Sequence, residues 1–590
     1  MNTAFLLVGS IVYFVLAFFI YGKFLDKTFG VNPKAPCPSW TLKDGVDYVP
    51  AHPAVLFGHH FASIAGAGPI VGPVLAVKFG WLPALLWILL GCVFVGAMHD
   101  FAAMFLSVRN QGRSIAYVIE KELGYAGRQI FIFFCLATLV LVVTVFTTQV
   151  ADGFIANPAV ATASVLFIML APVFGVIINQ KLLSLLEATL IFVPLMFLLI
   201  WLGTIIPLDL VKLLGVEKDT ARFVWILVLL YYAFIASTIP VWFLLQPRDY
   251  LNSFLLYAMM FLGIGGIAFA RLPLQMPAMH FPEKTQFIPH VLPLLFVTIA
   301  CGACSGFHAL VASGTSSKQI DNEKNIRTVG YGGMLLEGVL AVIAICSVGY
   351  LAPEQFAAQA VGKAAVPPAI QFANGVGNFV TALGIPFEVG ATFISLAISA
   401  FMLTSLDTAT RLARFLWQEL IMPRADGKNA VVEKAPEPAQ DENSKLNLVK
   451  TPTEEEVQRA TEPEPLNPAI RFLSNRWCAT LAIVVLAFIL AKSGDGTALW
   501  PVFGSANQLM AAMTLLGITL YLLRKKLRWL FAFFPMLFML VISVWALINL
   551  LVENCRASNW MLVCVGAFLL VMAILLAVFA IRALKVHRKS

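Results

Sequence analysis

The chain has 590 residues, of which 60% are hydrophobic and only 12% are charged, with a formal net charge of +8. A soluble protein of average composition carries roughly 25% charged residues. So few charges cannot cover a water-exposed surface for a chain of this length, and the composition excludes soluble, disordered and collagen-like proteins. The solvent for most of the chain is lipid. The positive excess is typical of cytoplasmic loops rather than of a nucleic-acid-binding surface.

Apolar runs long enough to cross a bilayer predict an all-α protein of about fifteen transmembrane helices. A spanning helix needs about 20 mainly apolar residues. The first run lacks the basic start and the small-residue cleavage site of a signal peptide, so we expect it to remain as a spanning helix. The candidate spans are residues 3–22, 54–77, 82–107, 128–150, 159–178, 184–206, 222–245, 251–271, 291–312, 329–351, 388–411, 476–492, 500–523, 529–551 and 560–583.

The loops between these spans alternate in charge. Lysine and arginine gather in every second loop, for example in residues 109–121 and 524–528, and the predicted boundaries place Arg248 in such a loop. The opposite loops are poor in basic residues, and residues 151–158 contain none. Because lysine and arginine accumulate on the cytoplasmic side, an odd number of spans places the N-terminus outside and the C-terminus in the cytoplasm.

One predicted span has its helix-breaking residues at its centre. The stretch from Phe57 to Ala76 reads FGHHFASIAGAGPIVGPVLA. In a helix interior glycine costs about 1 kcal/mol and proline about 3 kcal/mol, and unpaired backbone at this depth is tolerated only in protein or beside a watery cavity. A plain proline kink would need only one proline, so we predict a discontinuous helix whose ends face a ligand. The predicted substrate-binding residues at this break are Gly66, Ala67, Gly68 and Pro69.

A second interruption is predicted at residues 235–242, inside span 222–245. There Ser237 and Thr238 are expected to pair with carbonyls freed by a proline and to contribute to the substrate site. The two broken spans lie five helices apart and run in opposite senses. Interrupted helices in corresponding places of two halves are typical of transporters built on inverted repeats.

The predicted organisation has four parts. An N-terminal helix with a cytoplasmic loop precedes a ten-helix core, and a flexible cytoplasmic linker, rich in Pro, Glu, Lys and Ala, leads to a C-terminal four-helix module. A regulatory docking role for the linker is the alternative to a plain tether. The parts are residues 1–53, 54–422 (with repeats 54–206 and 222–411), 423–469 and 470–590.

Ionisable side chains inside the spans are the candidates for ion coupling, because burying them in lipid is costly. Histidine titrates near neutral pH and a buried carboxyl can also carry a proton; alternatively, each residue only pairs with a neighbour and fixes helix packing. The candidates are His59, His60, Asp100, His308, Glu337 and Asp407.

Two further possibilities concern ions other than protons. The hydroxyl-rich run that contains Ser313 and Thr315 offers the oxygen ligands that Na⁺ prefers. The histidine spacing matches no compact metal-binding motif, so no metal site is predicted. The chain has no phosphate-binding loop of the GxxxxGK[ST] type. Transport is therefore expected to be driven by an ion gradient or to be passive, and no enzymatic activity is expected.

Several long motifs resemble the carbon starvation protein A (CstA) family, and the likeness covers about residues 25–420. The C-terminal spans look like the family's second, smaller module. The motifs are DGVDYVP (44–50), LFGHHF (56–61), IAGAGP (64–69), VGPVL (71–75), HDF (99–101) with RS (113–114), HALVASGTSSK (308–318) and TSLDTATR (404–411).

The resemblance implies a bacterial inner-membrane secondary transporter of the APC superfamily with a LeuT-like core. It implies uptake of pyruvate or peptides under carbon limitation, with proton symport for the pyruvate carriers. We therefore predict import of a small nutrient, pyruvate first, by alternating access and cation symport, with H⁺ as the coupling ion and Na⁺ as the alternative. Peptide transport on the same scaffold and a membrane sensor of carbon starvation are the rival functions. No cofactor is predicted, the expected partners are the substrate and the lipid bilayer, and the oligomeric state stays open.

Overall fold

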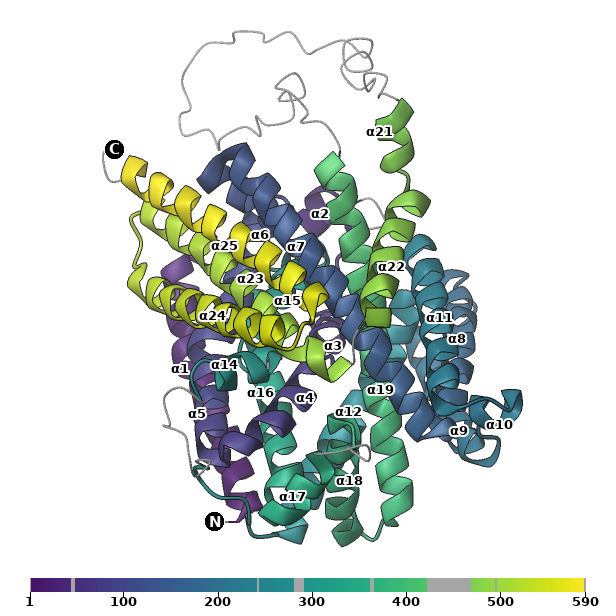
Figure 1. The fold of residues 1–590 in the computed structure, drawn as a ribbon. Coiled ribbons are helices and arrows are strands. Elements are labelled where there is room, and N and C mark those ends of the chain that lie inside the picture. Colours follow the sequence, from purple (N-terminus) through teal and green to yellow (C-terminus); the bar gives the residue numbers. More distant parts are fainter. Residues whose placement is uncertain are drawn as a thin grey trace.

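The computed structural model describes residues 2–43, 48–240, 243–280, 291–360, 366–421, 468–493 and 496–587, and every regular element in them is a helix. The first helix begins at one end of the bundle and the last ends at the other (Figure 1). We call these two ends the N side and the C side. Almost all of the predicted linker 423–469 lies outside the described residues, as do residues 44–47 and part of the predicted interruption at 235–242.

In the described part of the chain, thirteen helices are long and apolar enough to cross a membrane, and one bent pair, α3 (Pro53–Ile64) with α4 (Gly68–Ala76), makes a fourteenth span. The predicted all-α, multi-pass architecture is thus confirmed. The predicted span 476–492 corresponds to α22 (Arg476–Ser493), which is not one of these fourteen. The spans are α1 (Thr3–Phe29), α5 (Trp81–Gly91) with α6 (Ala97–Arg109), α7 (Ile115–Ala156), α8 (Pro158–Asn179), α9 (Leu185–Ile205), α11 (Lys218–Thr238), α12 (Leu245–Ala270), α14 (Leu294–Ile299) with α15 (Gly306–Gly314), α16 (Gly332–Gly349), α19 (Phe387–Ile421), α23 (Gly496–Arg524), α24 (Leu530–Arg556) and α25 (Trp560–His587).

Two sequence predictions between α11 and α12 are wrong. The predicted break within span 222–245 is instead the connection between two complete spans, because α11 ends at Thr238 and α12 begins at Leu245. Arg248, predicted in a cytoplasmic loop, lies in the first turn of α12 and is buried. Its burial is offset by two carboxylates, which hydropathy along the chain cannot reveal.

The second interrupted span is the one made of α14 and α15, and its break lies between these two half-helices. Ala300 has a positive φ of 38°, a conformation that L-residues rarely adopt, and residues 300–305 separate the two half-helices. α4 packs against α14 at this break. A Cβ atom at Gly72 of α4 would lie 2.6 Å from the carbonyl oxygen of Thr298, so the two broken spans touch backbone to backbone.

Long helices cross the middle of the bundle. α7 and α19 pack along each other, and α11 and α22 each pack against both of them. α23 contacts α7, α14 and α15, so the first two helices of the predicted C-terminal module lie within the core. Residues 352–387, predicted to be a loop, contain α17 (Pro353–Ala360) and α18 (Pro368–Val380), whose buried face packs against α4, α12, α16 and α19.

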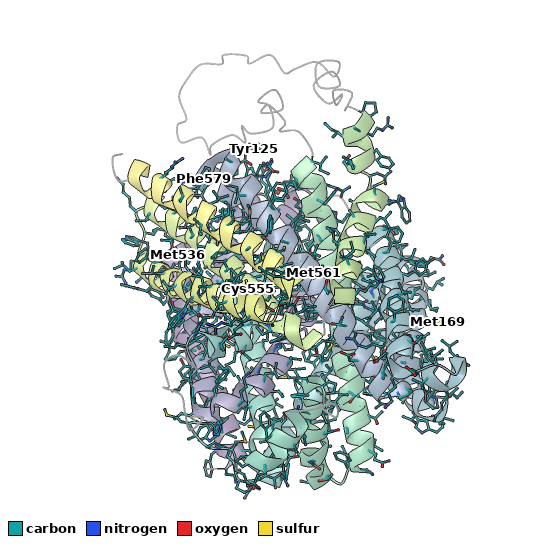
Figure 2. The ribbon with its side chains drawn as sticks, in the orientation of Figure 1. Tyr125, Met169, Met536, Cys555, Met561 and Phe579 are labelled. Atoms are coloured by element: carbon teal, nitrogen blue, oxygen red, sulfur yellow. The ribbon has the colours of Figure 1, made fainter. Side chains whose placement is uncertain are left out.

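The hairpin of α8 and α9 lies at the periphery. α9 buries few of its apolar residues, and Leu186 and Leu190 are 70% and 67% exposed. Met169 projects from the outer face of α8 (Figure 2). Exposed apolar side chains of this kind fit a lipid environment, where they lose nothing by facing the solvent.

Candidate functional site

The break between α3 and α4 leaves backbone donors free. The two half-helices meet at an angle of 47°. Ala67 accepts hydrogen bonds from the amides of Ile70 and Val71, whereas the N–H groups of Ala67 and Gly68 donate to no described residue. The N-terminus of a helix carries partial positive charge, so these two N–H groups can donate hydrogen bonds to an anion. Pro69 sits in the first turn of α4, where its missing N–H is not needed.

Gly66 brings α19 to this break. A Cβ atom at Gly66 would lie 2.7 Å from the Ser405 hydroxyl and 3.2 Å from a ring carbon of Phe146, so a side chain here would have to displace its neighbours. The Ser405 hydroxyl is buried and has no partner among the described residues. A free hydroxyl from α19 and two free amides at the α3–α4 break thus lie at the same level of the bundle.

The break between α14 and α15 is stabilised by α23 rather than left open. Asn507 accepts a hydrogen bond from the Phe307 amide at 2.9 Å and donates to the Ser305 hydroxyl at 3.0 Å. Trp500 and Gln508 donate to the carbonyls of Thr298 and Phe296, at the end of α14. The backbone groups freed by this break are therefore satisfied by side chains that follow about 200 residues later.

α19 lines two cavities. On the N side a cavity of about 300 Å³ lies between α7, α18 and the first turns of α19, with Gln149, Ser399 and Met402 in its wall. On the C side a cavity of about 60 Å³ lies between α3, α12, α15 and the last turns of α19. Its lining includes His59, Ser63, Asp249, Thr315, Lys318, Thr408 and Arg411.

Ser405 lies between these two cavities on the same helix. At 3.6 residues per turn, Ser405 lies about 60° around α19 from each of residues 402 and 408, which are themselves about 120° apart. Met402 lines the N-side cavity and Thr408 lines the C-side cavity. At 1.5 Å per residue, about 9 Å of helix separates Met402 from Thr408. The α3–α4 break therefore borders the short barrier between the two cavities.

A buried histidine–carboxylate cluster lies between α6, α15 and α16. The Asp100 carboxylate is 2.8 Å from His99 Nδ1 and 2.9 Å from His308 Nδ1, and His308 Nε2 lies 3.3 Å from Glu337. All four side chains are fully buried. Neither Glu337 oxygen has a hydrogen-bond partner among the described residues. The predicted residues Asp100, His308 and Glu337 thus form one centre, which lines neither of the two cavities.

A second buried group, which we call the Arg248 cluster, joins α12 to α19 and α11. Arg248 pairs with Asp407 and donates to Asp249 at 3.1 Å. Tyr232 donates to Asp407 at 2.8 Å, and Arg248 donates to the Tyr232 hydroxyl at 2.6 Å. Burying a charge is favourable only when it is paired and hydrogen-bonded, and here one guanidinium faces two carboxylates.

The adjacent histidines of α3 have different surroundings. His59 lines the C-side cavity, and its Nδ1 lies 3.5 Å from Asp249 of the Arg248 cluster. His60 is fully buried, and its Nδ1 lies 2.8 Å from the Ser316 hydroxyl. Successive residues of a helix point about 100° apart, which explains why only one of the two reaches the cavity.

The remaining predicted residues have structural partners or lie apart. The Ser313 hydroxyl donates to the Ala309 carbonyl and accepts from the Ile115 amide, while Thr315 lines the C-side cavity. Thr238 bonds within its own helix, and Ser237 is buried at the end of α11; neither lines the two cavities. The carbonyls freed at the end of α11 are instead satisfied by Arg411 of α19.

Sequence reasoning missed Arg248, Asp249, Tyr232 and Asn507. Arg248 was hidden because a positive charge beside an apolar run is typical of a loop. Asn507 carried a weak signal, since a polar amide inside an apolar helix needs a partner, but its partners come from a distant segment. These four residues show that the polar sites join segments far apart in the chain.

The fold, the cavities and the buried charges define a multi-pass membrane transporter. The chain belongs to the family described as carbon starvation protein CstA, whose model matches residues 2–367, 357–436 and 454–546.

Curated relatives carry transporter names. The protein named peptide transporter CstA of Bacillus subtilis is 32% identical over 571 residues, covering 88% of this chain and 86% of that protein. The peptide transporter CstA of Campylobacter jejuni is 30% identical, covering 89% and 76%. The pyruvate/proton symporter BtsT of Escherichia coli is 34% identical over 362 residues, covering 59% and 49%. Among solved structures, a manganese transporter of Eremococcus coleocola has a TM-score of 0.47 and 12% identity, covering 92% of this chain and 99% of that one.

Proposed function

We propose that this chain is a secondary transporter that imports a small carboxylate-bearing nutrient by alternating access. The observation that carries the proposal is α19, which lines one cavity on each side of a short barrier at the α3–α4 break. Opening the two cavities in turn would expose the same central groups to each side. The proposal places the chain in the bacterial inner membrane, with the N side outside and the C side in the cytoplasm, in keeping with the loop charges.

Inverted repeats would give this motion its symmetry. The broken span α3–α4 corresponds to α14–α15, α7 to α19, α11 to α22, and α12 to α23. This pairing is supported by contacts: α11 and α22 each pack on both α7 and α19, while α12 packs on α3 and α23 on α15. It favours repeats over residues 53–270 and 294–524, with the α8–α9 hairpin inserted in the first, instead of 54–206 and 222–411.

The substrate class is argued from the groups at the barrier. The free amides of Ala67 and Gly68 and the Ser405 hydroxyl are donors suited to a carboxylate or carbonyl oxygen of a substrate. Pyruvate and peptides both carry a carboxylate, so the names of the curated relatives fit the same chemistry. Pyruvate needs no partner for an ammonium group, whereas a peptide does.

We propose H⁺ as the coupling ion. Two buried clusters, one around Asp100 and His308 and one around Arg248 and Asp407, contain groups whose charge changes with protonation. The predicted Na⁺ site is less favoured, because the Ser313 hydroxyl already accepts from Ile115 and donates to Ala309.

Uptake by proteoliposomes tests the proposal. Purified protein is expected to accumulate radiolabelled pyruvate or alanyl-alanine when a pH gradient, inside alkaline, is imposed. A Na⁺ gradient alone should drive no accumulation. Uptake of neither compound under any gradient would contradict a transport function for these substrates, and uptake driven only by Na⁺ would replace the proton with sodium.

A further inference from the structure

We propose that Arg248 binds the carboxylate of the substrate in place of Asp407, and that Asp407 takes up the transported proton when this exchange occurs. The inference rests on the proposed function and names the residue pair that couples substrate to proton. The Arg248 cluster has the position that this role requires. Asp249 of the cluster lines the C-side cavity, and Arg248 itself lines a separate small cavity between α8, α9, α12 and α19.

The hydrogen bonding of the cluster leaves capacity for a ligand. Among the described residues, Arg248 Nε and Asp407 Oδ1 are buried and have no partner. Arginine offers a planar fork of donors that matches a carboxylate in two-point geometry. Tyr232 already donates to Asp407, and the same hydroxyl can donate to an incoming carboxylate. A site built for one carboxylate therefore holds one that belongs to the protein.

Asp407, rather than Asp249, is the carboxylate that can leave. Asp249 neighbours Arg248 on α12, and its other oxygen lies 3.5 Å from His59. Asp407 belongs to α19, a different helix, so its distance from Arg248 changes whenever α12 and α19 move relative to each other. The same two helices are also joined one turn away by the hydrogen bond from Asn252 to Thr404.

The charge of the site is conserved by the exchange. One guanidinium and two carboxylates give a net charge of −1 before binding. A substrate carboxylate on Arg248 and a proton on Asp407 give −1 again. Binding of the substrate carboxylate without a proton on Asp407 would bury a further uncompensated charge, which is strongly unfavourable in a dry interior. Proton and carboxylate therefore enter together or not at all.

Other charged groups around Asp407 are few in the described structure. Arg248 and Asp249 come from α12, Tyr232 from α11, and His59 from α3 reaches Asp249. Arg411 lies one turn further along α19 and donates to carbonyls of α11. α7 and α8 contribute neutral side chains near this level, Phe146 and Ser164. Among these groups, Asp407 is thus the carboxyl that pairs with Arg248 from a different helix.

The test uses the full chain in proteoliposomes with radiolabelled pyruvate. Asp407→Asn holds a neutral side chain in place, so pyruvate exchange in the absence of a gradient should persist. Accumulation of pyruvate under a pH gradient should fall to the level measured without a pH gradient. Arg248→Lys keeps the charge but loses the fork, so the half-saturating pyruvate concentration should rise about tenfold. The matched pair Asp152→Asn and Arg222→Lys changes a half-exposed ion pair of α7 and α11 and should behave as the wild type.

A binding measurement on the wild type removes any dependence on variant folding. In weakly buffered detergent solution, pyruvate should cause uptake of one proton per molecule bound, and the neutral amide pyruvamide should cause none. Pyruvate binding without proton uptake would overturn the inference, as would gradient-driven accumulation retained in Asp407→Asn. If the wild type transports pyruvate and both variants match it, only this inference fails. If the wild type transports neither pyruvate nor alanyl-alanine, the proposed function fails with it.

Discussion

Two clusters of buried ionisable side chains in this transporter include residues from helices that contact α3. In one, His308 lies between the carboxylates of Asp100 and Glu337; in the other, Arg248 lies between those of Asp407 and Asp249. Each of these basic side chains thus lies against two carboxyl groups that come from two different helices. Such sites stabilise only while every member is present, because the loss of one partner leaves another charge unpaired in the interior.

Replacing His308 tests this balance in the first group. His308→Gln leaves Asp100 and Glu337 without the imidazole that lies between them, and removing one partner of a buried pair costs about 3–5 kcal/mol. We expect a clear fall in the thermal unfolding midpoint in detergent. A second change, Glu337→Gln, removes one of the stranded carboxylates and should restore part of the loss. His280→Gln, in an exposed loop, is the control, and equal midpoints for the two histidine variants would contradict the pairing.

At the level of the helices, the sequence alone predicted one of the two broken spans. The break after α3 was predictable because Gly66, Gly68 and Pro69 weaken the helix locally. The break at Ala300 was not, because residues 300–305 contain no proline and read as a continuous apolar run. Its freed backbone groups are satisfied by Asn507 and Trp500, and such long-range pairing leaves no periodic signal. Asp100, His308, Glu337 and Asp407 were predicted one by one, whereas Arg248 and Asp249 were missed and the pairing depended on helix contacts.

The two broken spans pack so closely at Gly72 that we expect no side chain to be tolerated there. A Cβ atom there would lie 2.6 Å and 2.7 Å from two carbonyl oxygens of α14. Overpacking of this kind costs typically about 1–3 kcal/mol, so Gly72→Ala should lower the unfolding midpoint and reduce transport. Gly9→Ala of α1 has open space around it and should leave both unchanged. Wild-type transport and stability in Gly72→Ala would show that the contact is not close in the working protein.

The link from α23 to the second break is a separate expectation. Asn507→Ala removes the acceptor of the Phe307 amide and the donor to Ser305, and a buried group left unsatisfied costs about 1–3 kcal/mol. We expect a lower unfolding midpoint and slower pyruvate uptake. Asn554→Ala, near the end of α24, loses only a bond to the carbonyl one turn earlier and serves as the matched control. Equal behaviour of the two variants would argue against a role for α23 at the break.

At the scale of the whole molecule, orientation in the membrane follows from the charge of the loops. We expect the N side to face outward. In a background without the nine native cysteines, Ala382→Cys, exposed between α18 and α19, should react with a membrane-impermeant maleimide in intact cells. Lys324→Cys, exposed between α15 and α16, should react only after permeabilisation. The reverse pattern would invert the proposed direction of transport.

The exchange proposed for the Arg248 cluster keeps its charge constant, and this has an electrical consequence. A carrier that moves one proton with each carboxylate transfers no net charge, so the membrane voltage, worth about 2.3 kcal/mol per charge at 100 mV, does no work on the cycle. Only the pH difference can then concentrate the nutrient. One pH unit is worth about 1.4 kcal/mol and supports a tenfold gradient. A cell in acidic surroundings would fill its carboxylate pool even with its membrane depolarised, and would lose that ability as the medium approached its internal pH.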